Sequence, residues 1–310
     1  MCQIVVAGTR KISGIDHASA HEIELQDDLS PSEWIRPRLL PWGVREGTPV
    51  TSVAPSGYPA YVRVLHPAQR RPREPVTWRE IAAWSGRVYH PLMQFERICE
   101  PALRTQEPPP FDHVPEVGGV SPMLCMALYG ALRSWTSTSE TCWVGVWDGF
   151  GHLQGGSAAT ALTAAAATAV TAVRDGEVDE AERVKHEARA QAEAAMRERV
   201  RRAPRLSHPH RDYLLVRSSL DGVCRLQDWP WTVSPNLAWP DDRSWCVATE
   251  IDFDSTLVAC SDECAAALLT DPRLETFQVP PEGRLDIEGD VLNPPLPRGP
   301  GPERPPGELR

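Results

Sequence analysis

Three carboxylates alternate with other residues in the segment TEIDFDST, at Glu250, Asp252 and Asp254. On an extended strand, residues two apart share a face and lie roughly 7 Å from each other, so this spacing predicts a row of three acids. Carboxylate oxygens are the ligands that hard cations such as Mg²⁺ and Ca²⁺ prefer, and Asp241 and Asp242 could complete such a site. The alternative, which we favour, is a water-facing strand whose like charges discourage pairing with another chain.

The same acids also match a phosphatase motif. In haloacid-dehalogenase-like phosphatases a DxDx[TV] run supplies a nucleophilic Asp and an acid/base Asp, roles that Asp252 and Asp254 would fill here. In that family the motif follows the first strand of a parallel sheet, and later crossovers supply the remaining catalytic groups. The chain after Thr256 is too short for several crossovers, and it contains many Pro residues and no Lys. We therefore interpret the match as coincidence.

The eleven tryptophans are a second candidate set. Trp143 and Trp147 should lie on one strand face with a glycine between them, whereas Trp229, Trp231 and Trp239 fall in a loop broken by Pro. Indole rings offer flat apolar contact and one donor, so these residues could floor a groove for a sugar or a peptide. Because burial is the commoner fate of a strand Trp, we expect the loop group to be the surface candidate.

A third set consists of Arg63, His66, His90 and Gln94. A histidine beside an arginine could take part in acid/base chemistry or bind an anion. Both histidines precede Pro, a position biased to extended backbone at the ends of elements. We therefore expect these imidazoles to cap backbone groups.

The net charge of −10 makes the surface acidic, which disfavours sequence-independent binding to phosphate backbones. The basic stretch at 197–205 follows an acidic helix, and we interpret it as a solvated helix end. The longest uncharged run, 153–173, is mainly Ala, Thr and Gly, too poor in Leu, Ile and Phe for a membrane span. The chain opens without a secretory leader. We expect a cytoplasmic protein that binds neither nucleic acid nor membranes.

The eight cysteines are scattered without a CxxC pair, and several lie inside apolar runs. This pattern is typical of reduced, buried thiols rather than of a disulfide framework. Cys142 and Cys246 lie within predicted strands, and His208-x-His210 has no cysteine partner at the spacing of a zinc site. We therefore expect no metal and no cofactor.

The helices and strands that carry these residues can be predicted from the spacing of apolar residues and from helix-capping residues. Residues 50–65 predict two short strands broken by a Pro-Ser-Gly turn, with Tyr61, Arg63 and Leu65 on one face. Thr77 and Glu80 have the spacing of a capping box, so a helix should begin here and run through 84. Further helices are predicted at 91–103, 118–135 and 261–272, and further strands at 142–149, 211–222 and 245–258.

Strands outnumber clean strand-helix-strand crossovers, which favours an α+β fold: an antiparallel sheet with helices packed on one side. We divide the chain into an N-terminal arm (1–31), one discontinuous α+β domain (32–155 and 207–293), an Ala-rich and charged helical insertion (156–206) and a disordered tail (294–310). The insertion lacks an apolar stripe, so we interpret it as a solvated spacer. From about 280 the chain is too rich in Pro to pack, and we expect disorder after about 293.

Several stretches together resemble an actinobacterial protein family: VAPSGYPAYVRVLHP, WREIAAWSGRVYHPLMQF, TSETCWVGVWDGFG, RDYLLVRSSLDG and SPNLAWPDDRSWCVATEIDFDSTLVACS. A WWP-x-D-R-x-W-C-V-A-T-[DE]-x-D-x-x-[ST]-T-Y-V-G-G-S-like segment recurs in that family. The resemblance spans roughly 36–279 without the insertion. The resemblance implies a strand at 245–258. It suggests no particular activity and no catalytic residue, because no activity is known for the family. This chain departs from the pattern at Ala238, Leu257 and Ala259-Cys260, so a site lined by these positions would differ in shape.

These observations predict a non-catalytic recognition protein, immunity-like or regulatory, which binds a protein partner through Trp-rich loops and the acidic strand. One alternative is a metal-dependent hydrolase or transferase that uses the three acids of that strand. Another is a structural protein whose partner is its own copy. The candidate binding residues are Trp229, Trp231, Trp239, Asp241, Asp242, Arg243, Glu250, Asp252 and Asp254.

Overall fold

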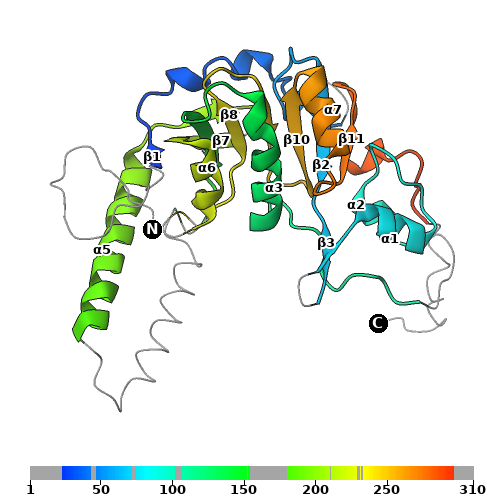
Figure 1. The fold of residues 1–310 in the computed structure, drawn as a ribbon, viewed down its shortest axis with the longest axis horizontal. Helices are drawn as coiled ribbons and strands as arrows, with labels where there is room; N and C mark the ends of the chain where they lie inside the picture. Colours follow the sequence, from blue (N-terminus) through cyan, green and yellow to red (C-terminus); the bar gives the residue numbers. More distant parts are fainter. Residues whose placement is uncertain are drawn as a thin grey trace, which may run out of the picture.

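The computed structural model of the chain shows an α+β fold built on one large antiparallel sheet (Figure 1). It describes residues 23–42, 47–71, 74–101, 107–151, 153, 180–209, 211–228, 231 and 233–296. The fold class predicted from the sequence, an antiparallel sheet combined with helices, is confirmed. No described helix is both long enough and apolar enough to cross a membrane.

Within these ranges the main sheet has nine strands in the order β1-β7-β5-β8-β9-β10-β2-β11, with β6 also pairing with β7. The strands are β1 (Glu24–Leu25), β2 (Ala60–Leu65), β5 (Cys142–Trp147), β6 (Leu206–His208), β7 (Arg211–Ser218), β8 (Leu237–Pro240), β9 (Cys246–Ala248), β10 (Ser255–Cys260) and β11 (Thr276–Gln278). β3 (Ala68–Arg70) and β4 (Glu74–Val76) form a separate two-stranded ribbon. In register, Val62 of β2 lies opposite both Val258 of β10 and Gln278 of β11.

The helices begin where the sequence supplies caps. They are α1 (Trp78–Ser85), α2 (Phe95–Ile98), α3 (Pro122–Leu132), α5 (Glu180–Arg202), α6 (Leu220–Val223) and α7 (Asp262–Thr270). The hydroxyl of Thr77 accepts a hydrogen bond from the N–H of Glu80 at 3.1 Å, as the capping-box spacing predicts. Ser121 and Ser261 cap α3 and α7 in the same way.

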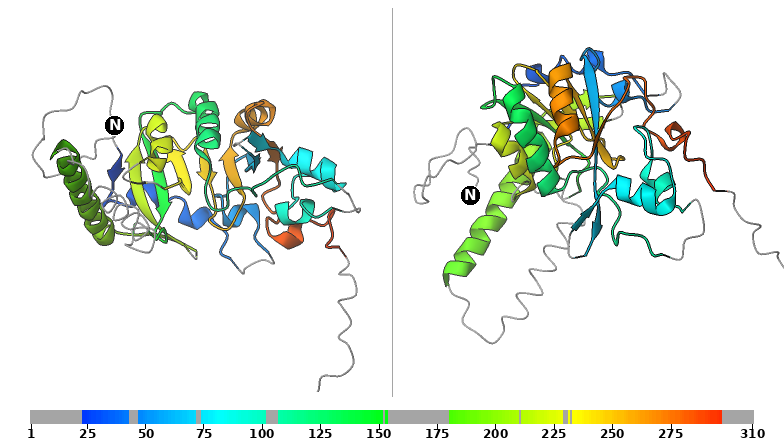
Figure 2. Two further views of the ribbon diagram at one scale, coloured as in Figure 1. Left: turned by 90° about the horizontal axis from the view of Figure 1, so that it is seen from below. Right: turned by 45° about the vertical axis from the view of Figure 1, so that its right-hand side comes forward.

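Both faces of the sheet are covered. Helices α3, α6 and α7 pack on one face, where they share a core with alternate residues of the strands, such as Val62, Val144 and Val247 (Figures 1 and 2). The described parts of the segment 29–54, which are residues 29–42 and 47–54, carry short 3₁₀ helices at Ser30–Ser32, Arg36–Arg38 and Val50–Ser52 and cover the opposite face. The left view of Figure 2 shows these layers, with the helices above the sheet and the segment 29–54 below it. A smaller hydrophobic core lies near the end of β2, where side chains of α1 and α2 pack against Leu65.

Three predicted elements differ from the observed ones. The first half of the expected hairpin at 50–65 is the 3₁₀ helix Val50–Ser52, although Tyr61, Arg63 and Leu65 do share a face of β2. The helix predicted at 91–103 is reduced to α2. The predicted strand at 245–258 is interrupted: β9 ends at Ala248, residues 249–254 form a turn, and β10 runs back antiparallel to β9.

The C-terminal strap, residues 281–293, packs against the domain, so the expectation that the chain from about 280 is too rich in Pro to pack is wrong. The N–H of Val50 donates to the carbonyl of Gly283 at 3.0 Å, and the N–H of Leu285 donates to the carbonyl of Thr48 at 2.9 Å. Leu285 is 2% exposed and belongs to the core beneath the segment 29–54. The predicted tail begins with three described residues, 294–296, and the rest of it lies outside the described residues.

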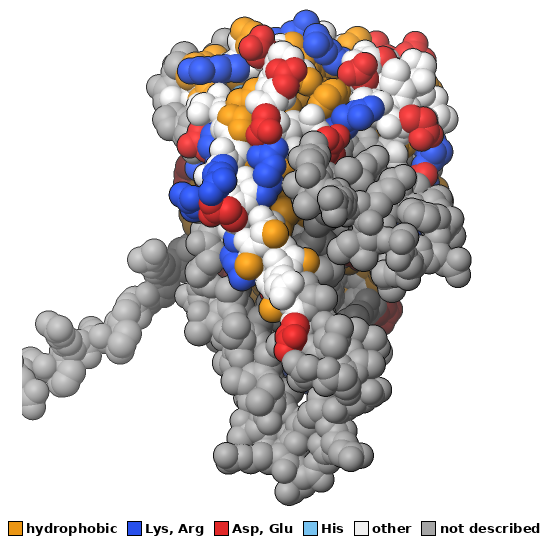
Figure 3. Space-filling view, turned by 90° about the vertical axis from the view of Figure 1, so that its left-hand side faces the viewer, with side chains coloured by type: hydrophobic (Ala, Val, Ile, Leu, Met, Phe, Trp, Pro, Cys, Tyr) orange, Lys and Arg blue, Asp and Glu red, His pale blue; other side chains and the backbone are white. Residues whose placement is uncertain are grey.

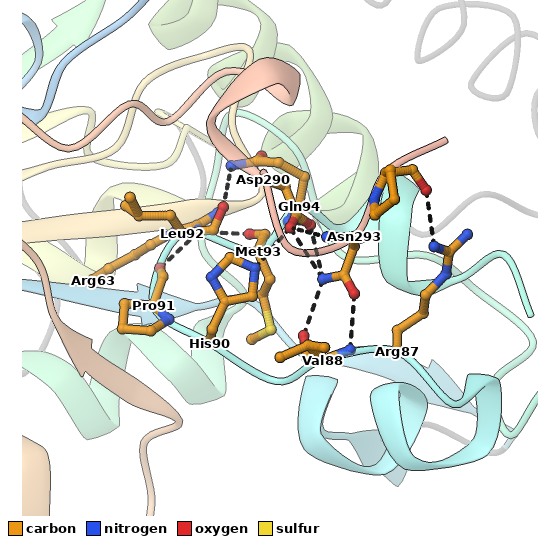
Figure 4. A network of polar contacts seen from close by, with 11 residues as sticks. Arg63, Arg87, Val88, His90, Pro91, Leu92, Met93, Gln94, Asp290 and Asn293 are labelled. Carbon is orange, nitrogen blue, oxygen red and sulfur yellow. Dashed lines mark hydrogen bonds and ion pairs between the residues drawn. The ribbon is translucent and has the colours of Figure 1, made fainter. Parts of the chain in front are cut away.

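Asp290 anchors the end of the strap (Figure 4). Its buried carboxylate accepts hydrogen bonds from Nε2 of His90 (2.7 Å), the N–H of Gln94 (2.9 Å) and the N–H of Asn293 (3.0 Å). Burial opposes ionisation, but these donors outweigh it and lower the pKa of Asp290. The Asn293 side chain bonds the N–H and the carbonyl of Val88 at 2.8 and 3.0 Å. Side-chain hydrogen bonds thus replace the ladder bonds that prolines cannot make.

Part of the predicted insertion lies outside the described residues, and its described end is α5. Near its end, α5 packs Met196 and Val200 into the core, as does Ala203 directly after it, whereas the other described side chains of α5 are mostly charged. Glu198 pairs with Arg201 and Arg202. Figure 3 shows positive and negative side chains interspersed over the described part of this face, without a continuous basic patch.

Candidate functional site

Several strand ends meet at one end of the sheet and bring together residues far apart in the sequence. Tyr213 near the start of β7 lies opposite Trp147 at the end of β5, and Leu237 at the start of β8 lies opposite Ala248 at the end of β9. The turn 249–254 therefore lies at the same end of the sheet as the loops that follow β5 and precede β7. Arg211, the first residue of β7, is long enough to reach this turn.

Arg211 binds two of the three predicted acids. Its Nε and one terminal nitrogen donate to Oε1 of Glu250 at 2.9 and 2.7 Å, and the same terminal nitrogen donates to Asp252 at 2.7 Å. The guanidinium also lies over the ring of Trp42, 4.8 Å from its centroid. The Glu250 side chain is only 5% exposed, whereas that of Asp252 is 66% exposed. Burial raises the pKa of Glu250, although Arg211 opposes this effect.

The third acid belongs to a different cluster. Asp254 lies 3.8 Å from the guanidinium of Arg63, which is buried in β2 and donates to the carbonyl of Met93 and the hydroxyl of Ser255. Burial raises the pKa of Asp254, and Arg63 acts against it. The expectation of three acids in one row on a strand is therefore wrong, because the turn directs Glu250 and Asp254 to different arginines.

A closely approaching loop holds this turn in place. Gly118 has a left-handed backbone (φ 76°), and its N–H donates to the carbonyl of Phe253 at 2.9 Å. A Cβ at Gly118 would collide with the carbonyl of Ile251, so only glycine permits this approach. Asn236 braces the same region, because its side chain donates to the carbonyl oxygens of Gly118 and Thr249.

Beside Arg211 is an open cavity of about 630 Å³, here called the His208 pocket, lined by Trp147, Asp148, Gly149, Ser207, His208, Arg211 and Asp212. His208 is 8% exposed, and neither of its ring nitrogens has a hydrogen-bond partner among the residues that the structure describes. Burial, with a smaller effect of Arg36, lowers the pKa of His208 to about 4. At neutral pH the ring is therefore uncharged and offers one donor and one acceptor, both unused.

The remaining walls of the pocket are acidic and aromatic. Asp148 lies 3.0 Å from the Arg205 guanidinium, and Asp212 accepts a hydrogen bond from the Ser207 hydroxyl at 2.6 Å. Trp147 supplies a partly exposed indole. This combination of carboxylates, an indole and a neutral imidazole suits a cationic group that can donate hydrogen bonds.

Two predicted tryptophans lie in the core rather than on a surface loop. Trp231 is 1% exposed and packs beneath the helices, and Trp239 is fully buried against Trp34, with ring centroids 6.1 Å apart. Trp229 lies outside the described residues. Trp143 is partly buried and donates from its indole nitrogen to Asp241 at 2.9 Å.

Asp242 and Arg243 stabilise a turn. The Asp242 carboxylate accepts from the N–H of Ser137 (2.7 Å) and that of Ser244 (3.1 Å), and despite partial burial such bonds lower its pKa to about 2. Arg243 has a left-handed backbone (φ 54°) and lies over the ring of Trp34, 5.3 Å from its centroid. Asp242 and Arg243 are thus both engaged in contacts within the protein, and these contacts account for their positions without a bound ligand.

The third predicted set consists of buried residues that bond the backbone. Nδ1 of His66 donates to the carbonyl of Glu116 at 2.7 Å, because a carbonyl can only accept, and its Nε2 then accepts from the hydroxyl of Thr256 at 2.9 Å. Burial lowers the pKa of His66 to about 4. His90 and Gln94 bind Asp290 as described above. The contact of His66 with Glu116 matches the expectation that the histidines cap backbone groups, whereas His90 bonds a side-chain carboxylate instead.

Among the described residues, no group of three or more His, Cys, Asp and Glu side chains is placed to hold a metal ion. The sequence prediction missed His208 and Arg211 as site residues. The signal for them was present: Trp147-Asp148 ends one strand and Arg211-Asp212 begins another, so polar residues interrupt two otherwise apolar strands. Recognising that these ends adjoin required the pairing of β5 with β7. Comparison of the chain with family models, curated proteins and solved structures gave no match.

Proposed function

We propose that the protein is a non-catalytic cytoplasmic binding protein, regulatory or immunity-like, which holds a basic side chain of a protein partner in the His208 pocket. The observation that carries this proposal is the pair of unpartnered nitrogens on the buried His208. A buried polar group without a partner costs about 1–3 kcal/mol, so such a group in a natural site calls for a functional explanation. A donor from a ligand would remove that cost.

The charge of the pocket favours a cation. A neutral imidazole accepts a hydrogen bond from an ammonium or a guanidinium group, and the carboxylates of Asp148 and Asp212 lie on the same walls. The indole of Trp147 adds a surface over which a cation is attracted. The net charge of −10 supports the same class of partner, because it attracts a basic protein from a distance.

The placement in the cytoplasm is supported by the thiols. All seven cysteines in the described ranges are free, including the five that are buried. Extracellular domains more often join their cysteines in disulfides.

The metal-dependent alternative receives less support from the geometry. A shared cation would have to displace Arg211 from Glu250 and Asp252, and Asp254 pairs with Arg63 instead of lying with them. Hard cations need several oxygen ligands converging on one point.

The proposal is tested with side-chain mimics. N-acetyl-arginine amide and N-acetyl-lysine amide are titrated against the protein while the His208 ring signals are followed by NMR. A saturable shift is expected with a dissociation constant of about 1 mM, since one side chain supplies only about 4 kcal/mol. N-acetyl-norleucine amide, which has a chain of similar length without charge, should leave the signals in place.

Two matched variants locate the site. Asp212→Asn removes a pocket carboxylate and should weaken binding several-fold. Asp228→Asn makes the same change at an exposed acid that is not among the pocket residues and should leave affinity unchanged. Equal shifts with norleucine amide, or equal affinity in the two variants, would refute a cation-selective pocket.

A further inference from the structure

Two cysteines far apart in the sequence contact each other between α3 and the segment that follows α6. Cys125 lies on α3, and Cys224 begins the 3₁₀ helix Cys224–Gln227 that follows α6. The two Sγ atoms are 2.7 Å apart, with the thiol of Cys125 as donor. A disulfide bond is about 2.05 Å long, so the sulfurs need to approach by only about 0.7 Å.

The surrounding contacts hold the two sulfurs in this position. The Gln227 side chain donates to the carbonyl of Val120 at 3.0 Å, just before α3 begins. At the other end of α3, Arg133 forms an ion pair with Asp221 of α6. The two segments are thus tied at both ends, and bond formation requires no rearrangement of the helices.

The two thiols differ in their access to solvent. Cys125 is fully buried, whereas Cys224 is partly exposed. The contact with Cys224, together with burial, raises the pKa of Cys125, so its thiol stays protonated at neutral pH. Cys224 is therefore the thiol that a reagent in solution meets first.

We propose that Cys125 and Cys224 form a reversible disulfide by exchange with a low-molecular-weight disulfide. The thiolate of Cys224 attacks one sulfur of the small disulfide, forms a mixed disulfide and expels one small thiolate. Once the Cys224 sulfur is held in the mixed disulfide, the Cys125 thiol releases its proton to solvent, and the resulting thiolate attacks the Cys224 sulfur and expels the second small thiolate. The small disulfide is reduced to two thiols, which carry the two protons lost by the protein, and the protein gains one disulfide. This inference is independent of the His208 pocket.

The cross-link would close a large part of the chain. The loop between the two cysteines contains β5, α5, β6 and β7 and encloses about 100 residues, a length at which a disulfide strongly restricts the unfolded chain. Oxidation should therefore raise the melting temperature of the domain by about 5 °C or more, and a reducing agent should reverse the change.

The chain offers an internal control pair on the same face of the sheet. Cys260 at the end of β10 and Cys264 in the first turn of α7 also contact each other, but only three residues lie between them. A disulfide there would constrain little of the unfolded chain. Cys224→Ser therefore serves as the test variant, and Cys260→Ser, the same substitution in the other pair, serves as its control.

The test treats the folded full-length protein with oxidised glutathione, then unfolds it in denaturant with an alkylating agent present to block every free thiol, and maps the peptides by mass spectrometry. Six of the eight cysteines should be alkylated, and one linked peptide should join Cys125 to Cys224. Cys260→Ser should retain this link and the rise in melting temperature, and Cys224→Ser should lose both. A mixed disulfide at Cys224 that never resolves, or a link between any other pair, would overturn the proposal.

Discussion

The anchor of the C-terminal strap gives a prediction whose size follows from the contacts. In Asp290→Ala the carboxylate is lost, and the donors from His90, Gln94 and Asn293 lose their buried acceptor. Each buried donor left without a partner costs about 1–3 kcal/mol. Water can enter the space left by the carboxylate, so we use the low end for each and expect a loss of about 3 kcal/mol in the free energy of unfolding.

Urea unfolding measures this loss. With a typical slope of about 2–3 kcal/mol per molar urea, the midpoint should fall by about 1 M. The matched control is Glu288→Ala, two residues away on the strap, whose side chain is 68% exposed and 3.6 Å from Arg97. This control should change the free energy of unfolding by no more than about 0.5 kcal/mol. A midpoint for Asp290→Ala within about 0.3 M of the wild type, which corresponds to less than about 1 kcal/mol, would refute the anchoring role.

The same anchor predicts an acid dependence. Because the pKa of Asp290 is lowered on folding, its contribution is fully present above the ordinary Asp value of about 3.9 and is lost as the pH falls through the lower folded value. The difference in stability between the wild type and Asp290→Ala should therefore shrink below about pH 4. A difference that stays constant down to pH 2.5, roughly one and a half units below that value, would contradict this assignment.

Two further predictions concern the buried histidines. Folding lowers the pKa of His66 from about 6.5 to about 4, so the free energy of unfolding should fall by about 3 kcal/mol as the pH drops through this window, and His66→Gln should flatten that part of the urea-unfolding profile. His208→Leu removes two unpartnered buried nitrogens and should raise the free energy of unfolding by about 1 kcal/mol while abolishing binding of N-acetyl-arginine amide. A less stable His208→Leu variant would indicate that the ring is satisfied in the free protein.

Local signals in the sequence were enough to predict several elements. The caps at Thr77, Ser121 and Ser261 start helices because their hydroxyls satisfy N–H groups within the next turn, an interaction that depends only on neighbouring residues. The sequence likewise predicts strands at 142–149 and 211–222, where the structure has β5 (Cys142–Trp147) and β7 (Arg211–Ser218).

Long-range contacts decided the elements that the sequence did not predict. The acids after Ala248 look like a continuation of β9, but the loop at Gly118 and the side chain of Asn236 hold a turn there. The strap is rich in Pro, yet Asp290 and Asn293 form hydrogen bonds with residues that lie 196 to 205 positions earlier in the sequence. No local period reveals such partners.

The site could be predicted only in part for the same reason. Glu250 and Asp252 were identified from their spacing, and they do adjoin the His208 pocket through Arg211. The arginine that pairs with them and the histidine of the pocket come from the other half of the sheet. Their proximity depends on the strand order β7-β5-β8-β9, which no single segment specifies.

The position of β2 has a consequence for the order of folding. Both of its neighbours, β10 and β11, come from the far end of the chain, so this strand has no sheet partner until residues 255–278 are present. Closing so long a loop is slow, and an apolar strand that waits with both edges open can pair with other chains. Arg63 places a charge in the middle of β2, and a charged residue pointing inward hinders such pairing. We therefore expect the arginine that pairs with Asp254 in the native protein to reduce aggregation of the nascent chain as well.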